Sequence, residues 1–170
     1  MDFKSFIRDV PDFPKEGVVF KDITLLLQNP KALNTTANAL FDLLNGQKID
    51  KVVGMESRGF IFGPMLAHKL NAGFVPVRKP GKLPSSTLSE TYDLEYGTDT
   101  LEIHIDGIEK GDKVLIHDDV LATGGTAKAT CNLIERLGGE IVQCNFLIEL
   151  TFLKGGSRIN DYAVKSLVKY

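Results

Sequence analysis

Residues 114–127 read VLIHDDVLATGGTA, in which a short apolar run leads into two adjacent acids and then into a glycine-rich turn. The run 114–118 is apolar enough for a buried strand, whereas Ala127, Cys131 and Ile134 recur at helical spacing. The stretch therefore predicts a strand, a loop and a helix in succession. In sheets built from such units, ligands bind at the carboxyl ends of the strands.

The same alternation of strand and helix continues on both sides of this stretch. Core strands are expected at 51–55, 74–78, 114–118 and 141–150, with a final strand in 163–168. Helices are expected over 2–9, from Pro30 to about Gly46, from Gly59, and from Ala127 to the glycine pair 138–139. The core strands are apolar throughout, which is typical of a parallel sheet covered on both faces. We therefore predict one α/β domain over residues 1–170, with a mostly parallel central sheet flanked by helices.

Two segments are expected to lie outside this core. Residues 1–30 form a small N-terminal elaboration, and residues 79–100 form a mobile loop followed by a hairpin that turns near Gly97. The loop part, KPGKLPSSTLSE, is polar and has few apolar anchors.

Composition excludes several classes of protein. The 170 residues carry a net charge of −2, without the basic excess of a nucleic-acid binder. No apolar run of about 18 residues is present, and the N-terminus lacks a hydrophobic secretory core. Cys131 and Cys144 are expected to be reduced, buried thiols. A cytoplasmic protein is expected.

The turn after the acids has the features of a phosphate-binding loop. Gly124 and Gly125 let backbone N–H groups approach an anion, and the N-terminus of the following helix adds partial positive charge. Thr123 and Thr126 can donate hydroxyl hydrogen bonds. The lysine of a nucleoside-triphosphate loop is absent, so a phosphomonoester is the better ligand.

Asp118 and Asp119 repel phosphate and must serve another group. Carboxylates accept hydrogen bonds from hydroxyls, so they suit a ribose attached to the phosphate, and they could help to hold a hydrated Mg²⁺. No direct metal ligand is otherwise predicted. The plain alternative is that the acids end a strand and that Thr-Gly-Gly-Thr caps a helix.

As a whole, VLIHDDVLATGGTA resembles the phosphoribosyl pyrophosphate (PRPP) signature of the type I phosphoribosyltransferases. The segments FPKEGVVFKDIT, ESRGFIFGPMLA, VRKPGKLP and YDLEYG are similar, in the same order, to the adenine-specific members of that family. The resemblance implies their fold, with a base-binding N-terminal hood and a flexible catalytic hairpin. It also implies a Mg²⁺-dependent homodimer in purine salvage that transfers phosphoribosyl from PRPP to N9 of adenine, giving AMP and pyrophosphate. Alternatives are an enzyme for another base, such as xanthine, and a PRPP-sensing regulator.

The resemblance also assigns roles to residues. It implies that the 5′-phosphate and ribose are bound by Asp118, Asp119, Ala122, Thr123, Gly124, Gly125 and Thr126. Pyrophosphate falls to Ser57, Arg58, Arg78, Lys79 and Lys82, some of them acting from a neighbouring subunit. A cis peptide between Glu56 and Ser57 is implied as well. Without the resemblance, Arg58 could equally be a surface ion pair, and the lysines a solvated basic turn.

The resemblance assigns adenine binding to Val19, Phe20, Lys21 and Leu150, with Phe20 stacking on the purine. Without the resemblance, Phe20 could be a core aromatic. Glu95 is implied as the catalytic acid–base group; by composition alone it could be an exposed strand carboxylate. Two positions depart from the family pattern. Glu56 stands where aspartate is usual, which puts the loop geometry in doubt, and Lys21 stands where arginine is frequent.

Overall fold

The computed structural model describes residues 1–93 and 97–170, which form two compact units, 1–39 and 40–170. The first unit contains a 3₁₀ helix η1 (Phe3–Phe6), strands β1 (Arg8–Val10) and β2 (Phe20–Asp22), helix α1 (Thr24–Gln28) and most of helix α2 (Pro30–Asp42). The expected helix over 2–9 is wrong after Phe6. Residues 8–10 instead pair antiparallel with β2, where Arg8 forms an ion pair of 2.5 Å with Asp22.

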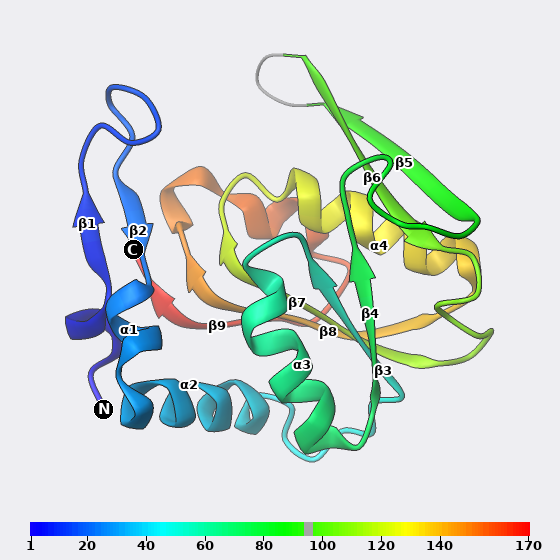
Figure 1. The fold of residues 1–170 in the computed structure, drawn as a ribbon, viewed down its shortest axis with the longest axis horizontal. Helices are drawn as coiled ribbons and strands as arrows, with labels where there is room; N and C mark the ends of the chain where they lie inside the picture. The colour runs from blue at the N-terminus through cyan, green and yellow to red at the C-terminus, as the bar shows by residue number, and fades with distance from the viewer. Residues whose placement is uncertain (94–96) are drawn as a thin grey trace. The chain divides into compact units, whose positions relative to one another are not determined.

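The second unit is built on a five-stranded sheet (Figure 1). Its strands are β3 (Lys51–Met55), β4 (Gly73–Val77), β7 (Lys113–Leu121), β8 (Glu140–Glu149) and β9 (Val164–Lys169). They are ordered β4-β3-β7-β8-β9, and every neighbouring pair is parallel. The predicted α/β class and central sheet are thereby confirmed.

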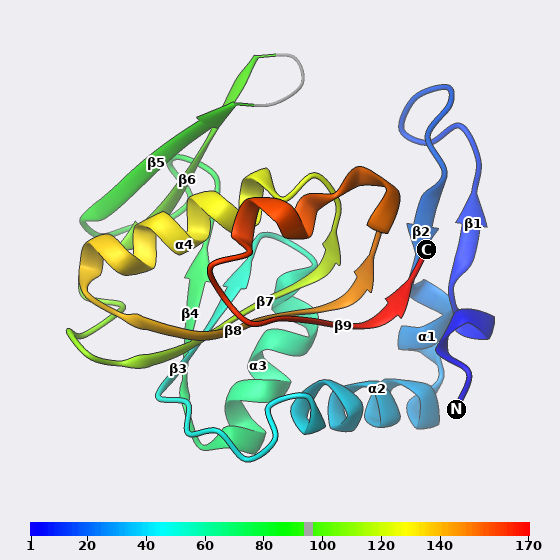
Figure 2. The same ribbon diagram turned by 180° about the vertical axis from the view of Figure 1, so that it is seen from behind.

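Helices cover both faces of this sheet, as its apolar strands predicted. Helix α3 (Gly59–Leu70) and helix α4 (Gly125–Leu137) lie on opposite faces, as the two views in Figures 1 and 2 show. Alternate residues of each strand therefore enter different halves of the core. Val53 and Ile116 join the cluster that contains α4, whereas His117 contacts Phe62 of α3. Both cysteines are free and fully buried in the α4 half.

The predicted hairpin is formed by β5 (Thr87–Asp93) and β6 (Thr98–His104), which pair antiparallel. It is attached to α4, because the Glu90 carboxylate accepts hydrogen bonds of 2.8 Å from Asn132 and from Arg136. It is attached to the end of β4 as well, through backbone hydrogen bonds between Arg78 and Glu102. Whether residues 79–100 move remains a prediction.

Two 3₁₀ helices that the sequence analysis did not predict, η2 (Thr151–Leu153) and η3 (Gly155–Ile159), follow β8. Across the described residues, no helix is long and apolar enough to cross a lipid bilayer.

Candidate active site

Most of the residues predicted for PRPP follow the carboxyl ends of three parallel strands. Glu56, Ser57 and Arg58 follow β3, and Arg78 and Lys79 follow β4. The loop 122–126 follows β7. Because parallel strands end on the same edge of a sheet, this topology brings together segments that are far apart in the sequence.

The phosphate loop, residues 122–126, lines a cavity of about 80 Å³. Helix α4 begins within it, at Gly125, so the first N–H groups of that helix have no partner within the helix and are available to an anion. Gly124 has a φ of +81°, in the left-handed region. A Cβ atom on Gly124 would lie 2.3 Å from the Gly155 carbonyl oxygen, and one on Gly155 would lie 2.1 Å from that of Ala122. The loop is thus fixed by backbone packing that only glycine allows.

The two acids lie within β7 and not after its end, because the strand keeps pairing with β8 as far as Leu121. Asp119 is buried, and its Oδ2 atom lies 2.9 Å from Nε of Arg58. Burial raises the pKa of Asp118 well above its usual range, and the adjacent Asp119 charge adds to the rise. Burial also raises the pKa of Asp119, although Arg58 opposes this. Such carboxyl groups are suited to hydroxyl partners and bound cations more than to phosphate.

Residues that follow β4 gather on the Glu56 carboxylate, Lys79 through its backbone N–H group. Arg78 donates two hydrogen bonds of 3.2 Å to it, the Lys79 backbone N–H donates one of 3.0 Å, and the Lys82 ammonium lies 3.5 Å away. These hydrogen bonds, led by those of Arg78, lower the pKa of Glu56. The predicted cis peptide between Glu56 and Ser57 is confirmed. Glu56 therefore organises Arg78, Lys79 and Lys82 on one side of the loop.

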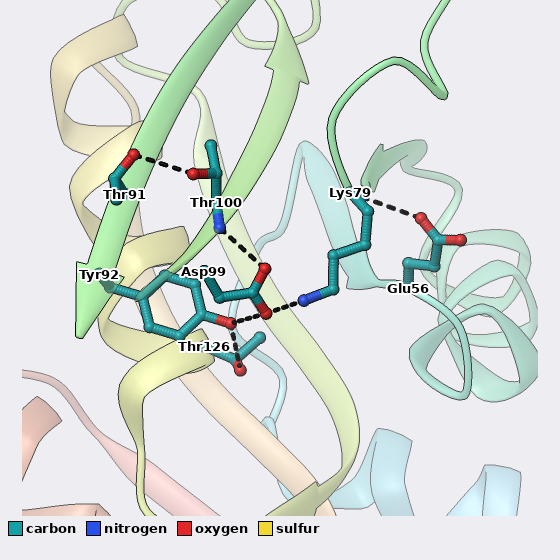
Figure 3. A network of polar contacts seen from close by, with 7 residues as sticks. All are labelled: Glu56, Lys79, Thr91, Tyr92, Asp99, Thr100 and Thr126. Atoms are coloured by element: carbon teal, nitrogen blue, oxygen red, sulfur yellow. Dashed lines mark hydrogen bonds and ion pairs between the residues drawn. The ribbon is translucent and has the colours of Figure 1, made fainter. Parts of the chain in front are cut away.

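The hairpin supplies two residues that the sequence analysis missed, Tyr92 and Asp99. The Asp99 carboxylate accepts from the Lys79 ammonium and from the Tyr92 hydroxyl, and that hydroxyl lies 3.1 Å from Thr126 Oγ1 (Figure 3). The YDLEYG segment pointed to the hairpin, but no spacing rule indicated that Tyr92 and Asp99 are cross-strand partners.

Gly155 was missed as well, although the Gly155-Gly156 pair was a visible signal. Arg158, at the end of η3, also approaches the loop, since a Cβ atom on Gly125 would lie 3.7 Å from its Nη1 atom.

The residues predicted for adenine are divided between the two units. In the first unit, Val19 is exposed, Phe20 packs edge-to-face on Phe13, and Lys21 forms an ion pair of 2.7 Å with Asp9. Leu150 follows β8 in the second unit. Their joint role stays a prediction. The predicted catalytic residue, Glu95, lies outside the described residues.

Among the residues that the structure describes, no group of three His, Cys, Asp or Glu side chains could hold a metal ion. The expected help of Asp118 and Asp119 in holding a hydrated Mg²⁺ stays a prediction. The Asp118 and Asp119 carboxylates could meet the water ligands of such an ion.

The chain is similar to known phosphoribosyltransferases in both sequence and structure. A model of the phosphoribosyl transferase domain family matches residues 22–169. An adenine phosphoribosyltransferase from Christiangramia forsetii is 64% identical over all of this chain and 99% of its own length. The crystal structure of adenine phosphoribosyltransferase from Rhodothermus marinus is 60% identical, with a TM-score of 0.95 over 99% of this chain and 96% of that one.

A third relative was solved with ligands. Adenine phosphoribosyltransferase from Saccharomyces cerevisiae, complexed with an imino-altritol bisphosphate and adenine, is 43% identical, with a TM-score of 0.91 over 97% of this chain and 96% of that one.

The chain belongs to the phosphoribosyl transferase domain family. The predicted type I fold is confirmed by these structures. Within the family, the full-length relatives confirm the predicted enzymatic activity, that of an adenine phosphoribosyltransferase.

Proposed function

We propose that the chain transfers the 5-phosphoribosyl group of Mg²⁺-bound PRPP to N9 of adenine, giving AMP and pyrophosphate, and that the predicted site residues carry this reaction. The edge of the sheet presents a backbone loop suited to one phosphate and, on neighbouring strand ends, a set of cations suited to a second, more highly charged anion. PRPP carries both groups on one ribose.

In this proposal the loop 122–126 holds the 5′-phosphate, with its backbone N–H groups and the hydroxyls of Thr123 and Thr126 as donors. Asp118 and Asp119 accept hydrogen bonds from the ribose hydroxyls and from water. Since Asp119 forms an ion pair of 2.9 Å with Arg58, it also sets the distance between the ribose and the pyrophosphate cations. Holding both ends of PRPP fixes the anomeric carbon for attack.

Pyrophosphate departs from the anomeric carbon as adenine N9 attacks the opposite face of the ribose. Ser57, Arg58, Arg78, Lys79 and Lys82 stabilise the negative charge that builds on the leaving group. When it is bound, Mg²⁺ would neutralise the charge of this pyrophosphate further. The protein thus works mainly by positioning and by electrostatic stabilisation.

Adenine is held by Val19, Phe20, Lys21 and Leu150, with the Phe20 ring stacked on the purine. Glu95 shares a proton with the purine as positive charge develops on it during attack. The adenine bound in the S. cerevisiae relative supports this choice of base. The physiological role is purine salvage, by a cytoplasmic homodimer.

A panel of bases tests the proposal. The purified chain is incubated with PRPP and with adenine, hypoxanthine, guanine or xanthine, with and without Mg²⁺, and the nucleotides are quantified by chromatography. AMP from adenine alone, dependent on Mg²⁺, is expected. A comparable rate with xanthine would assign the enzyme to another base, and PRPP binding without turnover of any base would indicate a sensor.

A further inference from the structure

One carboxylate oxygen in the hairpin accepts directly from a donor assigned to pyrophosphate and is connected, through a tyrosine, to a hydroxyl assigned to the 5′-phosphate. Asp99 Oδ2 accepts from the Lys79 ammonium and, over 3.2 Å, from the Tyr92 hydroxyl (Figure 3). The other oxygen of Asp99 accepts from the Thr100 N–H at 2.8 Å. The Tyr92 hydroxyl also lies 3.1 Å from Thr126 Oγ1, in the phosphate loop.

The number of protons available fixes which group donates in each hydrogen bond of this network. The Tyr92 hydroxyl has one proton, and Asp99, as a carboxylate, can only accept. When Tyr92 donates to Asp99, its oxygen can accept only from Thr126, so the Thr126 proton points toward the hairpin and away from the phosphate cavity. Lys79 is directly, and Thr126 indirectly, bonded to Asp99 Oδ2.

Asp99 remains charged in this setting. Burial by itself raises the pKa of Asp99, but the hydrogen bonds from Lys79, from the Thr100 N–H and from Tyr92 outweigh it and lower the pKa. The hairpin does not need a charge at position 99 to stay paired, because the β5–β6 register already holds Tyr92 and Asp99 opposite one another. The charge therefore serves the Lys79 ammonium.

We propose that Asp99 stands in for substrate phosphate in the ligand-free enzyme, holding Lys79 and, through Tyr92, Thr126, until PRPP takes both donors from it. Asp99 is then a positioning residue that opposes PRPP binding and links the two phosphate subsites. This inference rests on the proposed function, because it uses the roles assigned there to Lys79 and Thr126.

The Asp99→Asn variant tests the idea. Asparagine keeps the shape, and its single oxygen can still accept from the Thr100 N–H. Its NH₂ group then faces Tyr92 and Lys79, so it donates to the Tyr92 oxygen where the carboxylate accepted, which releases Thr126, and it no longer neutralises Lys79. Half-exposed ion pairs contribute modestly, so PRPP should bind about three- to tenfold more tightly. Dissociation constants are measured by calorimetry with PRPP, with pyrophosphate alone and with ribose 5-phosphate alone. The matched control is Asp93→Asn, which removes an exposed charge of the same hairpin and should leave all three constants unchanged.

Two further backgrounds separate this role from a merely structural one. In Lys79→Met, the Asp99→Asn change should no longer tighten pyrophosphate binding, because Asp99 acts through that ammonium. In Tyr92→Phe, which keeps the ring that packs on Gly125, Asp99→Asn should still tighten pyrophosphate binding but no longer that of ribose 5-phosphate.

Weaker or unchanged PRPP binding by Asp99→Asn would overturn the inference, as would an equal gain in the Lys79→Met background. These outcomes are distinct from a failure of the proposed function, which would show as an absence of AMP formation by the unaltered enzyme in the base panel.

Discussion

The phosphate loop and the cation cluster (Arg58, Arg78, Lys79 and Lys82) flank the same sheet edge but are built in opposite ways. The loop offers backbone N–H groups and is locked by the packing of Gly124 against Gly155. Every cation of the cluster is held by a carboxylate of the chain: Arg58 by Asp119, Arg78 and Lys82 by Glu56, and Lys79 by Asp99. In the proposed function the backbone donors of the loop are ready for an anion and only the Thr126 hydroxyl has an internal partner to give up, whereas every cation of the cluster must exchange a carboxylate for substrate.

This difference has a consequence for catalysis. In the proposed mechanism, a preformed loop binds the unreactive 5′-phosphate equally well before and during the reaction, which anchors the substrate without favouring the transition state. Cations that first neutralise internal carboxylates are freed toward the leaving pyrophosphate, where charge grows as the bond breaks. In the proposed mechanism the cluster is therefore the part of the site in which binding energy favours the reaction.

The largest effect is expected from a residue in neither region. Glu95→Gln keeps the size of the side chain but cannot share a proton with the purine, so kcat should fall by about 10²- to 10⁴-fold. PRPP affinity should stay nearly unchanged, because the phosphate contacts belong to the loop and the cluster. Single-turnover chemistry at the wild-type rate would remove Glu95 from the mechanism and leave catalysis to the two subsites.

The next largest effect should come from breaking the loop. In Gly124→Ala the added Cβ meets the Gly155 carbonyl oxygen and the residue keeps a left-handed φ, so ribose 5-phosphate affinity should fall about 100-fold and the free energy of unfolding by about 2–4 kcal/mol. Calorimetry and urea unfolding measure the two quantities.

The control for this variant is Gly111→Ala, which has a φ of +88° but open space around its Cβ position. It should cost only the backbone strain, about 1 kcal/mol, and leave affinity intact. Equal losses of affinity in both variants would mean that packing against Gly155 does not shape the subsite.

Replacing Asp118 and Asp119 together by asparagine should distinguish the contribution of the ribose to PRPP binding from the contributions of the two phosphate groups. Loss of the carboxyl oxygens that accept from the ribose hydroxyls is expected to weaken PRPP binding about 10- to 100-fold. Pyrophosphate affinity should not fall, because Arg58 loses the carboxylate that now holds it.

Binding of PRPP, pyrophosphate and AMP to this variant is compared with that to Asp106→Asn/Glu109→Gln, which removes two exposed charges between β6 and β7. A parallel loss of pyrophosphate affinity in the Asp118/Asp119 variant would show that the acids act on the cluster and not on the ribose.

The smallest effect is expected on the stability of the fold at low pH. The pKa of Glu56 is lowered in the folded protein, chiefly by its hydrogen bonds from Arg78, so its pairs stabilise the fold above the ordinary glutamate value of 4.5. This stability should be lost as the pH falls through the lowered folded value. The half-exposed partners limit it to below about 1 kcal/mol. Unfolding free energies at pH 7 and pH 3 should therefore differ less in Glu56→Gln than in the wild type; an identical pH dependence would count against Glu56 as the organiser of the cluster.

Sequence patterns predicted the parts of this molecule that depend on local periodicity. The apolar run 51–55 and the glycine turn before α4 were located correctly, because buried strands and helix starts leave local signals. Strand β1 was missed because its three residues are mostly exposed and are held by pairing with a strand ten residues further on.

The site was harder to predict where it depends on partners. The type of residue at Arg78 and Lys79 indicated an anion, but Glu56 lies 22 residues before Arg78, and Asp99 lies 20 residues after Lys79. No pattern within one segment reveals which carboxylate will neutralise which cation. The extension of β7 past the two acids likewise comes from its pairing with β8.

The contrast between the two subsites is tested most directly by calorimetry of the two half-substrates on a Lys79→Met/Lys82→Met variant. The cluster binds through side-chain charge, so pyrophosphate affinity should fall about 30-fold or more. The phosphate contacts proposed for the loop come mainly from its backbone N–H groups, so ribose 5-phosphate affinity should stay within about threefold of the wild type. Equal losses for both ligands would contradict the separation of a preformed loop from an exchangeable cluster.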